Sequence, residues 1–146
     1  MTNRISLALL IVAISSSVAV PQGSSRGNPL SGTTWQLVKF QGPDESIHTP
    51  DDKSKYTIAF GSNGRVTVRV DCNRGSSTWR ASADGRLHFG SWSRTSAKCG
   101  SGSLHDQIVR EGAAVTKFWI KDGRLFLSGM AAGGYYELEP HSGGRR

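Results

Sequence analysis

The stretch YTIAFGSNGRVTVRVD, residues 56–71, determines the fold class. In its second half Val66, Val68 and Val70 alternate with polar residues, and this period of two is typical of an antiparallel strand with one solvated face. Asn63 and Gly64 stand between this segment and the apolar run before it, and Asn-Gly is a strong hairpin signal. The stretch therefore predicts two strands joined by a tight turn.

Similar signals extend in both directions along the chain. Strands are expected in LSGTTWQLVKFQ near residue 35, in STWRA and RLHFG after the hairpin, and in YYELE near the end. Asp122-Gly123 predicts one further hairpin. Leu104 and Ile108 recur at helical spacing, and the predicted helix ends near Glu111. We expect an α+β domain in which a mostly antiparallel, curled, partly open barrel-like sheet of seven or eight strands packs on one helix.

The first 19 residues have the pattern of a secretory signal peptide. Arg4 precedes an apolar run that is too short to span a bilayer, and Ser17-Val18-Ala19 fits the small-x-small cleavage rule. We expect a flexible lead-in at residues 20–29, the folded domain at residues 30–140 and a disordered tail at residues 141–146. No cysteine near the cleavage point offers a lipid anchor, so we expect a periplasmic or secreted monomer whose mature chain has no transmembrane anchor.

The chain has two cysteines, Cys72 and Cys99. In an exported protein an even number of cysteines indicates a disulfide, and chain entropy gives such a bond a contribution of roughly 3 kcal/mol to stability. A free pair, structural or redox-active, is the alternative, although a CxxC motif is absent. Asn73 follows the first cysteine, and we expect its side chain to form a structural Asx turn there.

Five segments in order resemble the META domain, the HslJ-like family of bacterial envelope proteins. They are LSGTTWQLVKF, CNR after a valine-rich strand, RTSAKC, FWIKDGRLFLSG and YYELEP. The resemblance implies a β-rich exported domain with one helix, associated with envelope stress and drug tolerance, and with no established enzymatic activity. Two positions depart from the family pattern: Asp71 replaces a usual glycine, and Gly75 stands where an aromatic residue is common.

The formal net charge of +7 suggests an anionic partner. Because the protein is expected outside the cytoplasm, nucleic acid is not expected, and an anionic envelope polymer, an acidic lipid or an acidic protein is the candidate. Solubility alone is the alternative explanation of the charge. The candidate binding residues are Arg65, Arg69, Arg74, Arg80, Arg86, Arg94 and Trp92, the last because it lies in a polar stretch. The other three tryptophans are expected in the core.

No catalytic motif, metal-ligand spacing or cofactor signature is present; the four histidines are scattered. The sequence thus favours a non-catalytic exported binding module that is stabilised by one disulfide, with no catalytic residue, cofactor or metal expected. Two alternatives stay open. One is an inhibitor or protein-partner module that acts through the loop at residues 42–55, and the other is a hydrolase or redox enzyme with an unrecognised site.

Overall fold

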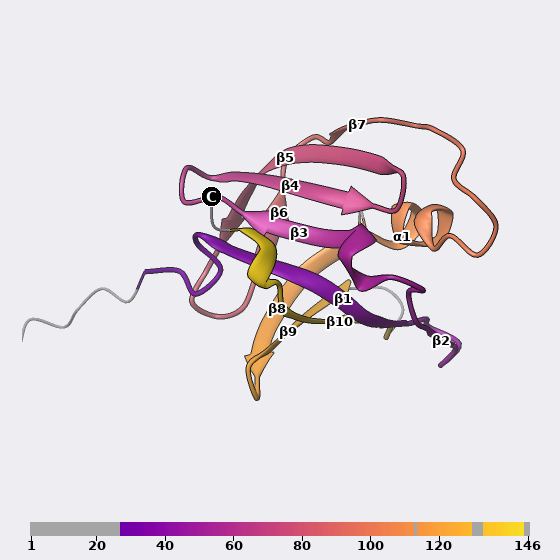
Figure 1. The fold of residues 1–146 in the computed structure, drawn as a ribbon. Helices are drawn as coiled ribbons and strands as arrows, with labels where there is room; N and C mark the ends of the chain where they lie inside the picture. The colour runs from indigo at the N-terminus through magenta and orange to yellow at the C-terminus, as the bar shows by residue number, and fades with distance from the viewer. Residues whose placement is uncertain (1–26, 113, 130–132, 145–146) are drawn as a thin grey trace, which may run out of the picture.

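The computed structural model describes residues 27–112, 114–129 and 133–144, so the expected signal peptide and most of the lead-in lie outside the described residues. The described chain forms one sheet and one α-helix (Figure 1). The elements are β1 (Thr33–Gln41), β2 (Ile47–His48), η1 (Lys53–Lys55), β3 (Tyr56–Phe60), β4 (Arg65–Val70), β5 (Asn73–Ala81), β6 (Leu87–Phe89), β7 (Ser93–Arg94), α1 (His105–Gly112), β8 (Val115–Lys121), β9 (Arg124–Gly129), β10 (Tyr135–Pro140) and η2 (Ser142–Gly144).

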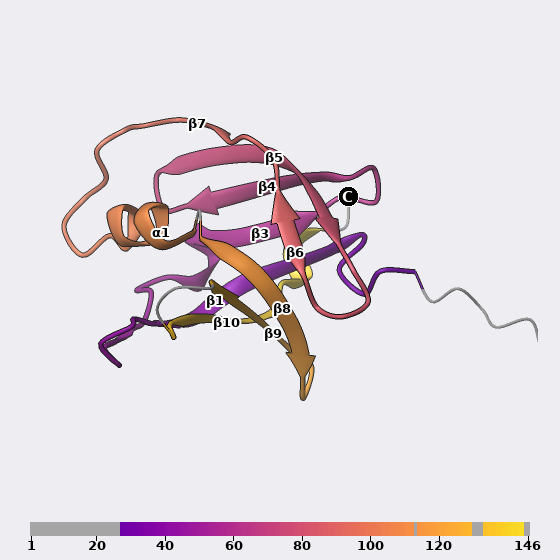
Figure 2. The same cartoon turned by 180° about the vertical axis from the view of Figure 1, so that it is seen from behind.

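The sheet is antiparallel and curls into a nearly closed barrel. Its order is β6-β5-β4-β3-β1-β10-β9-β8, and the short strands β2 and β7 pair with β1 and β5. The two ends of this order meet at a seam, where Arg86 forms a bridge with Lys117 and the Phe118 N–H donates to the Gly85 carbonyl at 2.8 Å. Figure 2 shows β6 and β8 side by side across this seam.

The expectation of an α+β domain packed on a helix is wrong in this respect: the fold is mostly β. The helix α1 has only eight residues and lies at one end of the barrel, beside the turn between β4 and β5 (Figure 2). Leu104 and Ile108 place their side chains against the core from that end. The sheet buries its apolar face mainly by closing on itself, which removes most of the need for a covering helix.

The barrel interior is filled by alternate residues of its strands. Phe60 and Leu125 are almost completely buried, and the Trp79 ring meets Phe60 edge-on at a centroid distance of 5.0 Å. Leu30, just before β1, is also completely buried. Asn28, expected in the flexible lead-in, already donates from its Nδ2 to the Ala81 carbonyl at 3.2 Å.

Three turns show why the hairpins form where they do. Gly64 has a φ of 76°, and Asp122 and Gly123 have φ values of 51° and 73°. The Asp122-Gly123 turn thus has the positive φ at both central residues that a type I′ hairpin turn requires, whereas in the β3–β4 turn only Gly64 has a positive φ. The third turn, between β4 and β5, places Asp71 at a φ of 56°, a conformation that glycine adopts more easily.

The chain remains attached to the sheet beyond β10. The His141 N–H donates to the Thr34 carbonyl at 2.9 Å, and its Nδ1 lies 2.7 Å from Gln36 Oε1. Residues 141–144, expected in a disordered tail, thus continue in contact with the domain and end in η2, while residues 145–146 lie outside the described residues. Within the described chain, no helix is long and apolar enough to cross a membrane.

Candidate functional site

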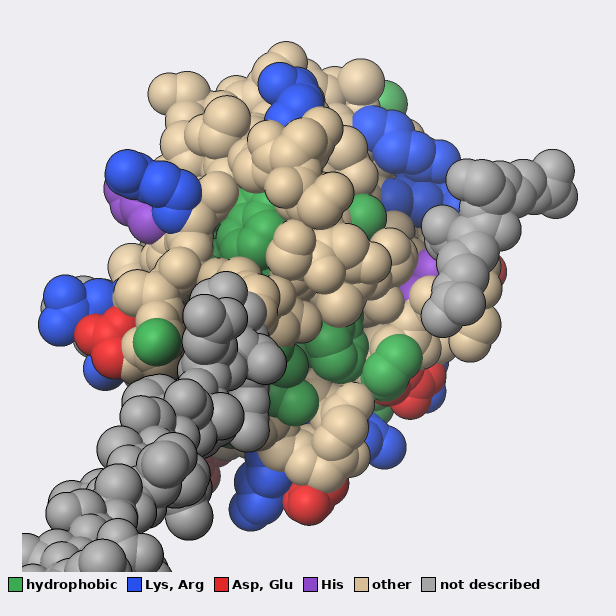
Figure 3. Space-filling view, turned by 90° about the vertical axis from the view of Figure 1, so that its left-hand side faces the viewer, with side chains coloured by type: hydrophobic (Ala, Val, Ile, Leu, Met, Phe, Trp, Pro, Cys, Tyr) green, Lys and Arg blue, Asp and Glu red, His purple; other side chains and the backbone are tan. Residues whose placement is uncertain are grey.

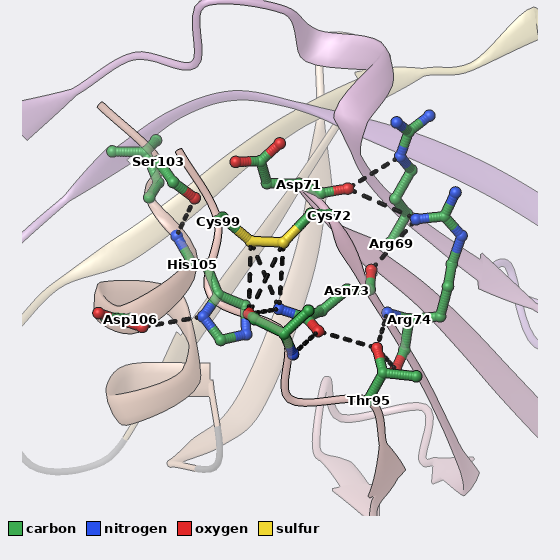
Figure 4. Close-up of a disulfide and its surroundings, with 12 residues drawn as sticks. Arg69, Asp71, Cys72, Asn73, Arg74, Thr95, Cys99, Ser103, His105 and Asp106 are labelled. Atoms are coloured by element: carbon green, nitrogen blue, oxygen red, sulfur yellow. Dashed lines mark hydrogen bonds and ion pairs between the residues drawn. A yellow bond between two sulfur atoms is a disulfide. The ribbon is translucent and has the colours of Figure 1, made fainter. Parts of the chain in front are cut away.

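A disulfide joins Cys72 in the β4–β5 turn to Cys99, which precedes α1 (Figure 4). The S–S distance is 2.01 Å, the Cα atoms lie 5.6 Å apart, and 27 positions separate the two residues. The expected pairing is therefore present. The bond fixes the end of a central hairpin to the segment that leads into the helix.

Asn73, the first residue of β5, is the most buried polar residue near the disulfide, with 2 % of its surface exposed. Its Nδ2 donates to the Ala97 carbonyl at 2.8 Å, and its Oδ1 accepts from the Ala97 N–H at 2.8 Å and from the Thr95 hydroxyl at 2.9 Å. The expectation of an Asx turn is wrong, because the Asn73 side chain does not bond the backbone next to it. It forms hydrogen bonds with a segment more than twenty residues further along the chain. Asn73 is thus structural, as expected, but as a bridge between segments.

Arg69 and Arg74 lie next to each other on the outer face of the same hairpin. They are directly opposite in the register of β4 and β5. Arg69 Nε donates to the Asp71 carbonyl at 3.1 Å, and an Arg74 guanidinium nitrogen lies 3.4 Å from the same oxygen (Figure 4). Like charges directly opposite each other in a sheet are unfavourable, so the two guanidinium groups repel each other.

Arg94 lies near these two residues because β7 pairs with β5. Gly75 pairs with Val68 on one side and with Arg94 on the other. The three arginines line an open hollow of about 710 Å³ on the outer face of the sheet. We call it the arginine groove; its other lining residues are Ser54, Thr57, Ala59, Thr67, Val68, Gly75, Ser76, Ser93, Thr95 and His141.

The arginine groove is positively charged and rich in hydroxyl groups. Its lining contains no carboxylate, and Arg69, Arg74 and Arg94 form no ion pair within the described chain. Asp52 lies nearby: its pKa is lowered mainly by hydrogen bonds from Ser54, and the charge of Arg69 contributes less. Guanidinium groups and hydroxyls are donors, so the groove is suited to an anion.

The other three candidate arginines are not part of the groove. Arg65 is on β4 four residues before Arg69, about 13 Å away along the strand. Arg80 pairs with His88 further along β5, and Arg86 forms an ion pair with Asp84 at 2.9 Å. Figure 3 shows basic side chains dispersed around the margin of one face, with hydrophobic side chains at its centre. The structure thus brings together three of the six arginines.

The tryptophans differ from expectation in two cases. Trp119 was expected in the core, but it is 41 % exposed and stacks on Phe126 on the outer face of β8 and β9. Trp92 was expected at the surface, but it is half-buried against the core and its ring lies 5.2 Å from Phe89. Trp35 and Trp79 are buried as expected.

A second hollow lies inside the barrel and was not predicted from the sequence. It has a volume of about 160 Å³ at the end that α1 covers. Most of its lining is apolar, from strands on several sides and from Ile108 and Val109 of the helix. Arg69, Arg74, Gly75 and Arg94 border both this interior cavity and the arginine groove.

The loop at residues 42–55 is held close to the sheet. The Gly42 N–H donates to the Ser46 carbonyl at 2.8 Å, β2 pairs with the end of β1, and the His48 ring stacks on Phe40 at 5.9 Å. Ile47 is 60 % exposed and projects from this ordered segment.

A serine, a histidine and an aspartate meet in this loop, but not as a nucleophilic triad. The Ser46 hydroxyl contacts both Asp44 and His48 Nε2, and Gln107 Nε2 lies 3.0 Å from the same His48 nitrogen. Because the amide nitrogen can only donate, His48 Nε2 accepts from Gln107 and the serine proton points to Asp44. This bond lowers the pKa of Asp44, whereas a nucleophile would donate to the histidine.

Groups with shifted pKa values stand apart from both hollows. In the described residues they are Lys39, Asp44, Asp52, Lys55, Asp84 and Glu139, and neither the interior cavity nor the arginine groove is lined by any of them. The same residues hold no cluster of three or more potential metal ligands.

The fold is similar to two solved structures. The solution structure of a protein from Burkholderia xenovorans has a TM-score of 0.61 at 15 % identity, covering 91 % of this chain and 99 % of that one. The crystal structure of a DUF4847 family protein from Bacteroides vulgatus has a TM-score of 0.56 at 13 % identity, covering 76 % and 94 %. At these identities the likeness concerns the fold alone.

The family follows from the sequence match. The model of the META domain matches residues 28–140, which include every strand of the barrel and the helix. The chain therefore belongs to the META domain family, as its sequence resemblance indicated. No curated protein matches the chain.

Proposed function

We propose that this META domain protein is an exported, non-catalytic module that binds anionic material of the cell envelope through the arginine groove. The observation that carries the proposal is the group of Arg69, Arg74 and Arg94 without a carboxylate partner. Arg69 and Arg74 are directly opposite in the sheet, where like charges repel each other, so a bound anion would relieve this repulsion. A role in envelope stress, as the family resemblance implies, would follow from attachment to that material.

The fixed orientation of two arginines in the groove favours a role in binding over a role in solubility alone. Arg69 and Arg74 are both oriented by the Asp71 carbonyl, and the disulfide fixes the turn that carries this carbonyl. Arginines that serve only solubility have no need of such orientation. Preorganised guanidinium groups lose less side-chain entropy when a ligand binds.

Vesicle binding tests the proposal. The mature protein is expected to bind phosphatidylglycerol vesicles, to bind phosphatidylcholine vesicles weakly, and to be released as the salt concentration rises. Replacing Arg69→Gln and Arg74→Gln together is expected to weaken binding about tenfold or more, since each loses charge-assisted hydrogen bonds.

The matched control is the pair Arg65→Gln and Arg80→Gln, on the same two strands but outside the groove. It removes the same net charge and is expected to retain most of the binding. Equal losses in both double variants would mean that overall charge, and not the groove, attracts the vesicles, and the proposal would fail.

The loop at residues 42–55 supports a second candidate, a protein-partner module. The exposed Ile47 on an ordered loop is the observation in its favour. If this function holds, Ile47→Ser abolishes capture of an envelope protein and leaves vesicle binding unchanged. Capture that is unaffected by Ile47→Ser would remove this candidate.

A further inference from the structure

The interior cavity is apolar and large enough for a small hydrocarbon group. Its volume is about 160 Å³, and its lining includes Val68 and Val70 of β4, Leu127 and Leu138 of β9 and β10, and Val109 of α1. An apolar cavity of about 150 Å³ inside another protein stays free of water and binds benzene. The interior cavity here is partly open to the surface, and its mostly apolar lining makes a hydrocarbon group a suitable occupant.

The cavity and the arginine groove adjoin at Gly75. This glycine faces the barrel interior between Val68 and Arg94, and a Cβ added there would lie 3.0 Å from Val68 Cγ2 and 3.6 Å from Arg94 Cβ. The wall between the two hollows therefore consists of backbone at this point. Arg74 and Arg94 border both hollows, so positive charge lies at the margin of the apolar space.

We propose that the interior cavity binds the hydrocarbon tail of a single-chain anionic amphiphile, a fatty acid in the simplest case. The carboxylate is held by Arg74 and Arg94, and for this head group the inference rests on the proposed function of the arginine groove. Tail and head group then each meet the surface that suits them, apolar for one and cationic for the other. Because the cavity has room for only a short segment of one chain, a two-chain lipid does not fit inside it.

The end of the barrel near α1 offers a way in. The helix has only eight residues and is too short to be stable without tertiary contacts. Leu104 and Ile108 hold it against the core, and the half-buried Trp92 lies among the residues that line the cavity. A small displacement of this helix exposes the apolar lining, while the disulfide keeps the preceding segment in place.

Octanoate and 1-octanol are the matched probes, since they share the tail and differ in charge. Binding to the full mature protein is measured by isothermal titration calorimetry. Octanoate is expected to bind about tenfold more tightly than octanol, because charged hydrogen bonds to arginine add to the same burial of the tail. The double replacement Arg74→Gln and Arg94→Gln is expected to reduce octanoate to the affinity of octanol and to leave octanol unchanged.

The tail site is tested by filling the cavity. Val109→Phe adds a ring from the helix side and is expected to weaken both probes at least tenfold; Leu138→Phe, from the barrel wall, is the second variant if the first does not fold. Benzene, which has no head group, is expected to compete with octanol. A folded Val109→Phe protein that binds both probes like wild type overturns the proposal.

The assignment of the head group to the two arginines can be rejected independently of the tail site. Equal affinities of wild type for octanoate and octanol would overturn the assignment of the carboxylate to the two arginines, and with it the amphiphile. The proposed function would still stand if phosphatidylglycerol vesicles bound through the arginine groove. Loss of vesicle selectivity with octanol still bound in the cavity would instead reject the proposed function and retain an apolar site.

Discussion

The carboxamide of Asn73 and the backbone of Ala97 are joined by two hydrogen bonds of 2.8 Å, one in each direction. This pairing resembles the exchange between two strands, with a side chain in place of one backbone. It holds the segment before α1 against the β4–β5 hairpin at the point where the disulfide also connects them. The same contact is therefore maintained by a covalent bond and by a buried amide.

Replacing Asn73→Ala should lower the free energy of unfolding by about 2 to 3 kcal/mol, because two backbone groups lose their partners in a partly buried place. Urea unfolding of the oxidised protein measures this loss. Ser96→Ala, on an exposed residue of the same segment, is the control and should change little. A loss below about 0.5 kcal/mol in Asn73→Ala would mean that water replaces the amide without cost.

Removal of the disulfide by Cys72→Ala and Cys99→Ala should lower the free energy of unfolding by roughly 3 kcal/mol, the value expected for closing a loop of this length. The reason is that the unfolded chain gains conformational entropy when the cross-link is removed. Urea unfolding of the variant and of wild type in dithiothreitol should agree. If the reduced wild-type protein unfolds at the same urea concentration as the oxidised protein, the bond does not stabilise the fold.

Asp71→Gly should raise the free energy of unfolding by about 1 kcal/mol, because the residue has a φ of 56° that disfavours a Cβ. Asp71→Ala is the matched control, since it removes the carboxylate and keeps the Cβ. Thermal unfolding should rank glycine above both others, and an alanine variant as stable as the glycine variant would contradict the role of the backbone.

The lowered pKa of Glu139 predicts that the stability of the fold depends on pH. Gln36 and Lys53 donate to its Oε1 at 2.8 and 3.0 Å and lower its pKa from the ordinary 4.5. Because the folded pKa is the lower one, the stabilisation is complete above pH 4.5 and is lost as the pH falls through the folded value. Unfolding of wild type and Glu139→Gln from pH 7 to pH 3 should show a difference that shrinks in acid. A difference that is constant over this range would exclude the effect.

The hairpins could be predicted because their signals are local. Asn63-Gly64 and Asp122-Gly123 set the turns, and each turn then sets the register of its two strands. The pairing of Arg69 with Arg74 follows in the same way from the two-residue turn between them. The sequence analysis named both arginines as candidate binding residues but did not pair them, although the hairpin register alone brings them together.

Closure of the barrel could not be predicted, since it depends on contacts between distant segments. The seam joins Arg86 to Lys117, and Arg94 reaches the groove only because β7 pairs with β5. Neither contact can be inferred from the spacing of apolar residues in the sequence. The position of α1 at one end of the barrel follows from this closure. The sequence analysis therefore missed the position of the helix for the same reason that it missed the closure.

The tryptophan errors have different origins. Phe118, Trp119 and Ile120 form an apolar run that hides the alternation of β8, yet the buried Phe118 requires that its neighbour Trp119 point outward. This signal was present in the sequence. Trp92 lies in a polar stretch and gains its apolar neighbour Phe89 only through the folded chain.

The position of β1 in the middle of the sheet has a consequence for the order of folding. β1 lies between β3 and β10, and its Trp35 pairs with Pro140. The first strand thus waits for the last one, and until β10 is synthesised the segments β3–β6 and β8–β9 can meet only at the seam between β6 and β8. Assembly is therefore expected to follow synthesis, at the slower rate that such distant pairings impose.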